Sequence, residues 1–426
     1  MSDPRADLEK AIGSLPRTTA EIVAAEEKGQ IPTYSKYPVA VVSGRRSTVV
    51  DAEGKRYLDL YGGHAVALPG HCHPRVVAAI TAQAQRLLFY SQVVYNDVRA
   101  AAVLAVAALG PVGLRRIFVC NSGTEANETA MKLARKATGR RRVVSLKDGF
   151  HGRTIGSLAA TGLGKYRDPA YPIPTEHDFV AYGDLDEAAA AIGPETAAMI
   201  LEPIPSMGGI RVASKAYFQG LRRLCTERGA LLIFDEVQTG FGRTGTLFAG
   251  EHFGVTPDFI TGAKGAAGGI PAGVVFVRED LAAKVKLGEQ GTTFGGGPIA
   301  SAALAATAKV IVDEDLPGNA RRVGAALCQA LAGVPGVVST AGLGLMIGIN
   351  LDRPAKPVIA ALVKKGFLTG SCESLPAQIR LLPPLVLSDA EAATFVVALR
   401  GVLATAPAAA APGAAAPAAT APGRPT

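Results

Sequence analysis

The middle of the chain alternates short apolar runs with segments of helical pattern. Between about residues 115 and 280, the apolar runs are RRIFVC, RRVVSL, AAMILEP, ALLIFDE, DFITG and AGVVFV. Most of them are separated by helical stretches such as ETAMKLARKA and KAYFQGLRRLCTERG. Strands that are apolar throughout are typical of a mostly parallel sheet that is covered on both faces. This region therefore predicts an α/β fold.

The segments on either side have a different pattern. From Tyr37 to Leu60, the runs VAVV, STVV and RYLDL are separated by the turn sequences SGRR and DAEGK, which predicts a small antiparallel sheet. Pro74 then opens a predicted helix, PRVVAAITAQAQRLL. Residues 310–403 combine helices with short strands such as GLMIGINL and IRLLPPLV. We expect a smaller second domain there.

The 426 residues are enough for two or three domains. Residues 1–35 are polar and predict a loosely attached N-terminal helix. From Ala404 onward only Ala, Pro, Gly, Thr and one Arg occur, which predicts disorder. The predicted division is an N-terminal segment of the small domain (1–75), a large domain (76–308), a C-terminal small domain (309–403) and a disordered tail (404–426).

Composition narrows the class of protein. With 48% hydrophobic and 19% charged residues the chain can bury a large core, and it has no apolar run of about 18 residues that would span a membrane. The net charge is +8, but no Lys/Arg block exceeds three residues and only 6% of residues are aromatic, which argues against nucleic acid. Five scattered cysteines without a CxxC pair, and a start without a signal sequence, predict a cytoplasmic enzyme. Anionic small substrates explain the positive charge equally well.

Three loops that follow predicted strands carry candidate chemistry. The first contains Ser122, Gly123 and Thr124 and precedes the helix ETAMKLARKA. Amides at a helix N-terminus attract an anion, and glycine lets the backbone approach it, so this loop predicts a phosphate site. Helix capping by Ser122 or Thr124 explains the same residues without a ligand.

The other two loops supply an acid and an amine. Asp235 ends an apolar strand, at the sheet edge where α/β proteins bind ligands. A buried aspartate there needs a cationic partner. Lys264 follows the strand DFITG in a glycine-rich loop, and a lysine with a lowered pKa forms a Schiff base with an aldehyde. A solvated acid and a surface lysine remain the alternatives for either residue alone.

Taken together, the three loops meet the needs of pyridoxal 5'-phosphate (PLP), which requires a phosphate cradle, a lysine and an acid beside its ring nitrogen. The chain resembles the class III PLP-dependent aminotransferases, most closely the acetylornithine and ornithine aminotransferase group. The resemblance runs from about residue 35 to 400. It implies the PLP-dependent transferase fold (fold type I), with a large, mostly parallel seven-stranded sheet domain and a smaller α+β domain. The segments that carry it are GGHAVALPGHCHP, NSGTEANETAMKLAR, FHGRTIGSLAATG, LLIFDEVQTGFGRTG, GVTPDFITGAKG, GTTFGGGP and IRLLPPL.

The resemblance also implies roles for individual residues. Lys264 would bind the cofactor covalently and, once displaced, would move a proton as base and acid, while Asp235 would keep the ring nitrogen protonated. Thr293 would reach the phosphate of the neighbouring subunit, which implies a homodimer with shared sites. The other cofactor contacts would be Ser122, Gly123 and Thr124 at the phosphate, Phe150 and Val237 at the ring, and Gln238 at its phenolic oxygen.

Two arginines mark the substrate side in the family pattern. Arg153 and Arg380 match carboxylate-binding arginines, which suit the two carboxylates of 2-oxoglutarate. The other substrate candidates are Thr292, Glu202, His64 and Tyr95; a packing role explains the last two equally well.

The chain departs from the family pattern at one position. The family has a second glutamate, paired with the arginine that matches Arg380, where this chain has Met207. Arg380 must therefore stay available or pair with another acid, and Glu289 and Glu373 are candidates by composition alone.

The predicted function is transfer of an amino group from an ω-amino donor, such as acetylornithine, to 2-oxoglutarate by a ping-pong mechanism. An aminomutase of the glutamate semialdehyde type and an amine transaminase would use much of the same machinery. A non-catalytic PLP-binding protein is disfavoured because Lys264, Asp235 and Phe150 are all retained. His71 and His73 form an HxH pair without further ligands, so no metal site is predicted.

Overall fold

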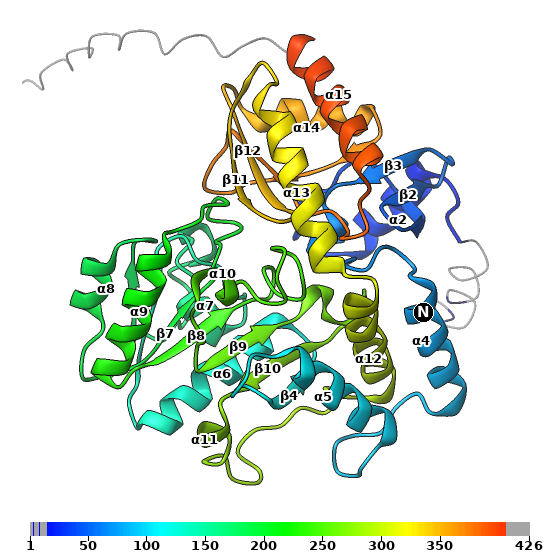
Figure 1. The fold of residues 1–426 in the computed structure, drawn as a ribbon. Helices are drawn as coiled ribbons and strands as arrows, with labels where there is room; N and C mark the ends of the chain where they lie inside the picture. Colours follow the sequence, from blue (N-terminus) through cyan, green and yellow to red (C-terminus); the bar gives the residue numbers. More distant parts are fainter. Residues whose placement is uncertain (1–2, 4–7, 9–14, 406–426) are drawn as a thin grey trace, which may run out of the picture.

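The computed structural model describes residues 3, 8 and 15–405, and a seven-stranded sheet forms its larger part (Figure 1). β10 is antiparallel to both of its neighbours, and every other neighbouring pair in this sheet is parallel. The predicted large, mostly parallel sheet is therefore confirmed. In spatial order, its strands are β4 (Arg116–Cys120), β10 (Gly273–Val277), β9 (Phe259–Gly262), β8 (Leu231–Asp235), β7 (Thr196–Leu201), β5 (Arg142–Leu146) and β6 (His177–Val180).

Apolar residues on both faces of this sheet are buried. On β8, Ile233 packs into one hydrophobic cluster with helix α6, while Leu232 and Phe234 pack into another cluster on the opposite face. This alternation explains why the strands read as continuous apolar runs. The helices and turns of this region are α5 (Asp97–Leu109), α6 (Gly123–Thr138), α7 (Ile155–Ala160), η1 (Gly164–Tyr166), α8 (Leu185–Ala191), α9 (Lys215–Arg228), α10 (Gly250–Phe253), η2 (Lys264–Ala267), α11 (Glu279–Ala282) and α12 (Pro298–Asp313).

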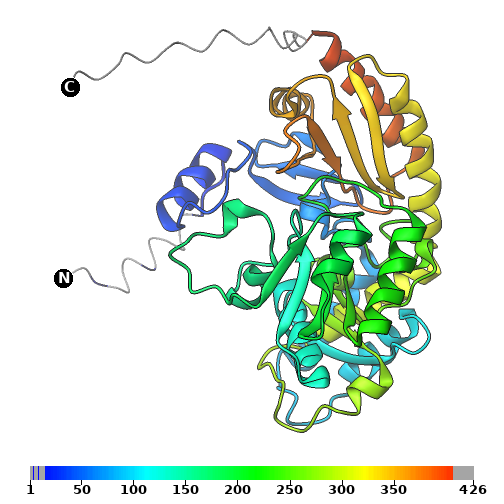
Figure 2. The ribbon, with the colours of Figure 1, turned by 90° about the vertical axis from the view of Figure 1, so that its left-hand side faces the viewer.

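The N-terminal residues form the predicted antiparallel sheet, and a distant strand extends it. β1 (Val41–Arg45), β2 (Thr48–Asp51) and β3 (Arg56–Asp59) pair in order, and β13 (Phe367–Leu368) adds to β3 in parallel. The predicted N-terminal helix is α2 (Thr19–Gly29), which buries no residue. It lies beside the loop that follows α7 (Figure 2). Two further helices lead into the large sheet, α3 (Gly62–Ala65) and α4 (Pro74–Arg86), and Pro74 opens the second as predicted.

The C-terminal residues form a third sheet beside the N-terminal one (Figure 1). β11 (Val337–Leu343), β12 (Met346–Leu351), β15 (Gln378–Leu381) and β14 (Gly370–Ser371) are neighbours in that order, and all are antiparallel. The helices of this part are α13 (Leu316–Ala332), α14 (Ala355–Lys364) and α15 (Asp389–Thr405). The predicted tail lies outside the described residues except for its first two, which end α15. None of the helices that the structure describes is long and apolar enough to cross a membrane.

Candidate active site

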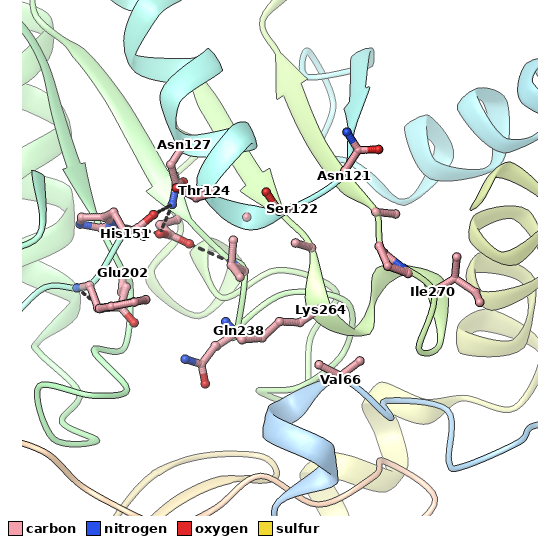
Figure 3. A pocket seen from close by; sticks show the side chains of 18 of the residues that line it. Val66, Asn121, Ser122, Thr124, Asn127, His151, Glu202, Gln238, Lys264 and Ile270 are labelled. Carbon is pink, nitrogen blue, oxygen red and sulfur yellow. Dashed lines mark hydrogen bonds and ion pairs between the residues drawn. The ribbon is translucent and has the colours of Figure 1, made fainter. Parts of the chain in front are cut away.

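A pocket of about 390 Å³ opens where β8 ends and α6 begins (Figure 3). Its wall combines residues from the loops that follow β4, β5, β7, β8 and β9. Parallel strands place their carboxyl ends at one edge of a sheet, which is why these loops converge. Nine of the predicted site residues line the pocket, namely Ser122, Gly123, Thr124, Phe150, Glu202, Asp235, Val237, Gln238 and Lys264.

Asp235 is the buried acid of the pocket. Its Oδ2 accepts hydrogen bonds from Asn127 Nδ2 and His151 Nδ1, both at 2.7 Å, and its Oδ1 accepts one from the Val237 amide at 3.1 Å. The ionised carboxylate only accepts, so the shared proton places His151 in the Nδ1–H form. The sequence predicted a cationic partner for this acid. In the described residues its partners are His151, the side-chain amide of Asn127 and the backbone amide of Val237, and none is a lysine or an arginine.

The first turn of α6 offers two amides without a partner. Ser122 caps the helix, because its side chain accepts from the amide of Glu125 at 3.3 Å. The capping interpretation of Ser122 is thus correct. The amides of Gly123 and Thr124 have no acceptor within the described part of the chain. Unpaired amides at a helix N-terminus form an anion site, so capping and phosphate binding are compatible here.

Lys264 stands in the same pocket with its amine unpaired. Its Nζ has no hydrogen-bond or ion-pair partner among residues 15–405, and its backbone adopts φ +42° in the left-handed region. Burial lowers the pKa of the Lys264 ammonium, while the negative charges of Asp235 and Glu202 act in the opposite direction. A strained backbone and an unpaired amine are features of functional sites rather than of surface lysines.

Glu202 and Gln238 are tied to one serine. Glu202 Oε1 accepts from the Phe150 amide at 3.0 Å and Oε2 from the Ser206 amide at 3.2 Å. Burial, together with the nearby charge of Asp235, raises the pKa of Glu202 to about 7. The Ser206 hydroxyl donates to Gln238 Oε1 at 3.0 Å, which leaves the Gln238 amide group to face the pocket.

Arg380 is buried beside these residues and pairs only with neutral groups. It donates from Nη1 to Ser206 Oγ at 2.8 Å, from Nη2 to Tyr61 Oη at 3.2 Å and from Nε to the Ser371 carbonyl at 2.7 Å. No carboxylate in the described residues lies within 4 Å of its guanidinium. Of the two acids considered for it, Glu373 pairs with Lys165 and Glu289 with Lys136. Neither proposed pairing with Arg380 is therefore correct.

Arg153 is exposed at the mouth of the site, among aromatic rings. Its guanidinium carbon lies 5.3 Å from the ring centre of Tyr34, 5.1 Å from that of Tyr166 and 6.0 Å from that of Phe150. Its Nη1 also lies 3.4 Å from Tyr34 Oη. Cation–π contacts hold a guanidinium without neutralising its charge.

The remaining candidates lie at different distances from the pocket within one copy of the chain. Thr292 Oγ1 accepts from Asn121 Nδ2 at 3.0 Å, and Asn121 lines the pocket. His64 is exposed, and its Nδ1 lies 2.6 Å from Tyr61 Oη. Thr293 and Tyr95 are exposed, and neither forms a hydrogen bond with a pocket residue in the described part of the chain. Their roles stay predictions.

Sequence reasoning missed several residues of this site. Asn127 and His151 hold Asp235, while Ser206 and Tyr61 hold Arg380. His151 directly follows Phe150, and Asn127 lies one helical turn after Gly123, so their places in the motifs could have revealed them. His71 and His73 bind different carboxylates, those of Asp59 at 2.7 Å and Glu314 at 3.0 Å.

Comparison with known proteins agrees with this geometry. Residues 31–403 match the family model described as Aminotransferase class-III. The chain is 44% identical over 386 residues to the LysW-aminoadipate semialdehyde transaminase of Deinococcus radiodurans, covering 89% of this chain and 90% of that protein. It is 41% identical over 366 residues to the acetylornithine aminotransferase of Methanopyrus kandleri, covering 86% and 94%.

Solved structures show the same fold. The ornithine aminotransferase of Toxoplasma gondii, described with partial occupancy of PLP at its active site, superposes with a TM-score of 0.87 at 29% identity, covering 95% of this chain and 98% of that one. An (S)-enantioselective omega-transaminase from Thermomicrobium roseum gives a TM-score of 0.85 at 30% identity, covering 91% and 98%. The chain therefore belongs to the class III aminotransferases and is a PLP-dependent transaminase.

Proposed function

We propose that this enzyme moves the amino group of an ω-amino donor related to acetylornithine to 2-oxoglutarate, in two half-reactions that share one pocket. The main support for the proposal is that Lys264, whose amine is unpaired in the described residues, and Asp235, a buried carboxylate, line the same cavity. Relatives named acetylornithine aminotransferase support the donor class.

The residues of the pocket fit PLP. The free amides of Gly123 and Thr124, with Ser122, would hold the phosphate. A Cβ on Gly123 would lie 2.9 Å from Val237 Cγ2, so only glycine lets Val237 pack against the first turn of α6. Val237 and Phe150 would then cover the two faces of the ring, and Gln238 would reach its phenolic oxygen. Asp235 Oδ1 accepts one hydrogen bond from the described residues, that of the Val237 amide, and could take a second from a protonated ring nitrogen.

Lys264 would carry the proton that the reaction moves. When bound, PLP withdraws electrons from the carbon that bears the amino group and makes its proton labile. Because burial lowers the pKa of Lys264, more of its amine is free to accept that proton and to return it at a second carbon, on the other side of the nitrogen. Asp235 stays in place as the negative charge of the site because Asn127 and His151 both bind it.

Two arginines would bind the two carboxylates of 2-oxoglutarate, one each. Arg153 stands at the mouth of the site, and Arg380 connects to the pocket wall through Ser206 and Gln238. The other residues proposed to face substrate are Thr292, Glu202, His64 and Tyr95.

A second copy of the chain is the proposed partner. The segment before α5 and the loop before α12 expose large apolar side chains, and the rings of Phe89 and Phe294 lie 5.1 Å apart between them. A homodimer would cover these groups and would let exposed Thr293 reach the phosphate of the neighbouring site. Exposed Tyr95 belongs to the same surface.

The absorbance of the bound cofactor tests the function. With holoenzyme, acetylornithine should abolish the resting band and 2-oxoglutarate should restore it, with formation of glutamate. Initial rates measured at several concentrations of both substrates should give the parallel lines of a ping-pong mechanism. Isomerisation of a donor without consumption of an oxo acid would identify an aminomutase instead. A band that responds to no donor would identify a binding protein.

A further inference from the structure

Tyr61 joins Arg380 and His64 into one hydrogen-bonded unit. Its Oη lies 3.2 Å from Arg380 Nη2 and 2.6 Å from His64 Nδ1. The ring of Tyr61 packs against the backbone of Gly370, where an added Cβ would lie 2.3 Å from a ring carbon. Gly370 is the partner of Arg380 across the β14–β15 pair, so glycine at this position makes room for the tyrosine ring beside the guanidinium.

The loop that carries Tyr61 is itself fixed. Asp59 Oδ1 accepts from the amides of Tyr61 and Gly62, and its Oδ2 accepts from the amide of Gly63. His71 binds the same carboxylate. Four hydrogen bonds to one buried acid therefore hold Tyr61 and His64 in place relative to Arg380.

The direction of each proton in the unit follows from its chemistry. Arginine only donates, so the Tyr61 oxygen accepts from Arg380, and its single proton can be donated to His64 Nδ1 at 2.6 Å. His64 Nδ1 is then an acceptor, and the ring carries its proton on Nε2. The His64 side chain keeps contact with solvent, but the protein groups that displace water around its ring and the cations Lys264, Arg380 and Arg153 lower its pKa, in agreement with a neutral ring.

Arg380 keeps two N–H groups for a ligand. A guanidinium has five donors, and residues 15–405 supply acceptors for three of those on Arg380, leaving one on each of Nη1 and Nη2. Two adjacent donors match the two oxygens of a carboxylate. All three acceptors are uncharged, and a buried guanidinium without a counter-ion is unfavourable until an anion binds.

We propose that Tyr61, acting with His64, is a specificity-determining positioning residue that replaces an acidic partner of Arg380 and keeps this arginine open to a carboxylate throughout the reaction. The ligand class is a carboxylate next to the reacting carbon, as in glutamate and 2-oxoglutarate. This proposal rests on the proposed function, because 2-oxoglutarate is its acceptor. It differs from a gated arginine in that no protein acid must move away before the carboxylate binds.

The test uses glutarate, an unreactive dicarboxylate, and holoenzyme. Calorimetric titration should give a dissociation constant for Tyr61→Phe about 3- to 10-fold higher than for wild type, because one anchor of the guanidinium is lost. Tyr37→Phe is the matched control: the Tyr37 hydroxyl donates to the Thr369 carbonyl at 2.7 Å and not to Arg380. This control should bind glutarate like wild type.

A second readout needs no ligand. Ring ¹⁵N–¹H correlation spectra, assigned with His64→Gln, should show wild-type His64 neutral with its proton on Nε2 from pH 6 to 8. In Tyr61→Phe this preference should be lost and the pKa of His64 should rise, because Nδ1 no longer receives a proton from tyrosine. Tyr37→Phe should again match wild type.

The outcomes separate the two claims. Unchanged glutarate affinity in Tyr61→Phe, or a wild-type His64 with its proton on Nδ1, would overturn the role of Tyr61 and leave the aminotransferase proposal intact. Failure of wild type itself to bind glutarate would overturn both the acceptor assignment and the role of this unit. If Tyr61→Phe folds poorly, the tautomer of wild-type His64 still tests the role of Tyr61, because that measurement does not use the variant: a proton on Nε2 supports the role and a proton on Nδ1 overturns it.

Discussion

Replacing Met207 with glutamate should close Arg380 to substrate carboxylates. Met207 is buried next to Ser206, whose hydroxyl accepts from Arg380. The Met207 carbonyl accepts from Cys372 Sγ at 3.4 Å, and the neighbouring Ser371 carbonyl accepts from Arg380 Nε. Two residues that accept from Arg380 therefore lie near position 207. Ser206 precedes it in the sequence, and Ser371 precedes Cys372, whose Sγ donates to the Met207 carbonyl. We therefore expect a glutamate at this position to pair with the N–H groups of Arg380 that have no acceptor.

The size of the effect follows from two opposing contributions. Two unit charges about 4 Å apart attract by about 4 kcal/mol at an effective dielectric constant of 20. Removing the new carboxylate from water opposes this by an amount of similar order. A net gain of about 1–3 kcal/mol for the internal pair would have to be given up when a ligand binds, so glutarate affinity should fall about 5- to 150-fold.

Calorimetric titration of holoenzyme with glutarate measures this effect, and Met207→Gln is the matched control. Glutamine has nearly the size of glutamate but no charge, so Met207→Gln should stay within about threefold of wild type. In the same variant series, only Met207→Glu should raise kcat/KM for acetylornithine, because the internal pair neutralises Arg380 while an ω-amino donor is bound.

Equal glutarate affinity in Met207→Glu and Met207→Gln would refute the reasoning, because it would mean that a charge at position 207 does not reach Arg380. Efficient use of acetylornithine by wild type, with no change in Met207→Glu, would show that the enzyme needs no switch. The substrate inference would then return to the ordinary expectation for the family.

Three further predictions concern the pocket and its acids. Lys264→Ala should abolish turnover but remain folded, and borohydride reduction of wild-type holoenzyme followed by peptide mapping should label Lys264; a label on another lysine would contradict the assignment. Asp235→Asn should keep the fold but lose most of kcat, since an amide cannot keep the ring nitrogen protonated, and near-wild-type turnover would show that another group serves that nitrogen. Burial raises the pKa of Glu236 from 4.5 to about 7, so the folded state binds its proton more tightly than the unfolded state. Its contribution to stability is present below pH 4.5 and is lost as the pH rises to about 7. Thermal unfolding at pH 5 and pH 8 should therefore show Glu236→Gln gaining Tm relative to wild type at the higher pH; a constant difference between the two proteins would contradict the shift.

The sequence predicted the sheet because burial on both faces leaves a direct signal, continuous apolar runs. It did not predict that β10 runs against its neighbours, since an apolar run such as AGVVFV carries no information about direction. β6 was also missed, because His177 and Asp178 interrupt the apolar pattern of a strand at the sheet edge. The pairing of β13 with β3 joins segments about 300 residues apart, which only the tertiary structure shows.

The cofactor side of the site was more accessible to prediction than the substrate side, for a physical reason. The phosphate loop, the acid and the lysine each follow a strand, and strand ends converge wherever such a sheet forms. No comparable rule places the partners of Arg380 in the sequence, because Tyr61 is 319 residues away from it and Ser206 is 174 residues away. Only the packing of the N-terminal loop onto the C-terminal sheet brings them together.

A second buried arginine shows why the free donors of Arg380 point to a ligand. Arg243 also lacks a carboxylate in contact among the described residues, and burial lowers its pKa to about 9. Its Nη1 donates to the carbonyls of Leu345 and Pro383 and so connects the loop after β8 to the C-terminal strands, while its Nε and Nη2 have no partner within residues 15–405. Within the described residues, Arg243 neither lines the pocket nor hydrogen-bonds to a residue that does, whereas Arg380 is bonded to Ser206, and Ser206 to Gln238 in the pocket wall. A buried guanidinium without a carboxylate partner lowers the stability of the folded protein when no ligand can reach it, as for Arg243. Beside the pocket, a substrate carboxylate can supply the negative charge that Arg380 lacks. The N–H groups of Arg380 that have no acceptor therefore indicate a carboxylate-binding site.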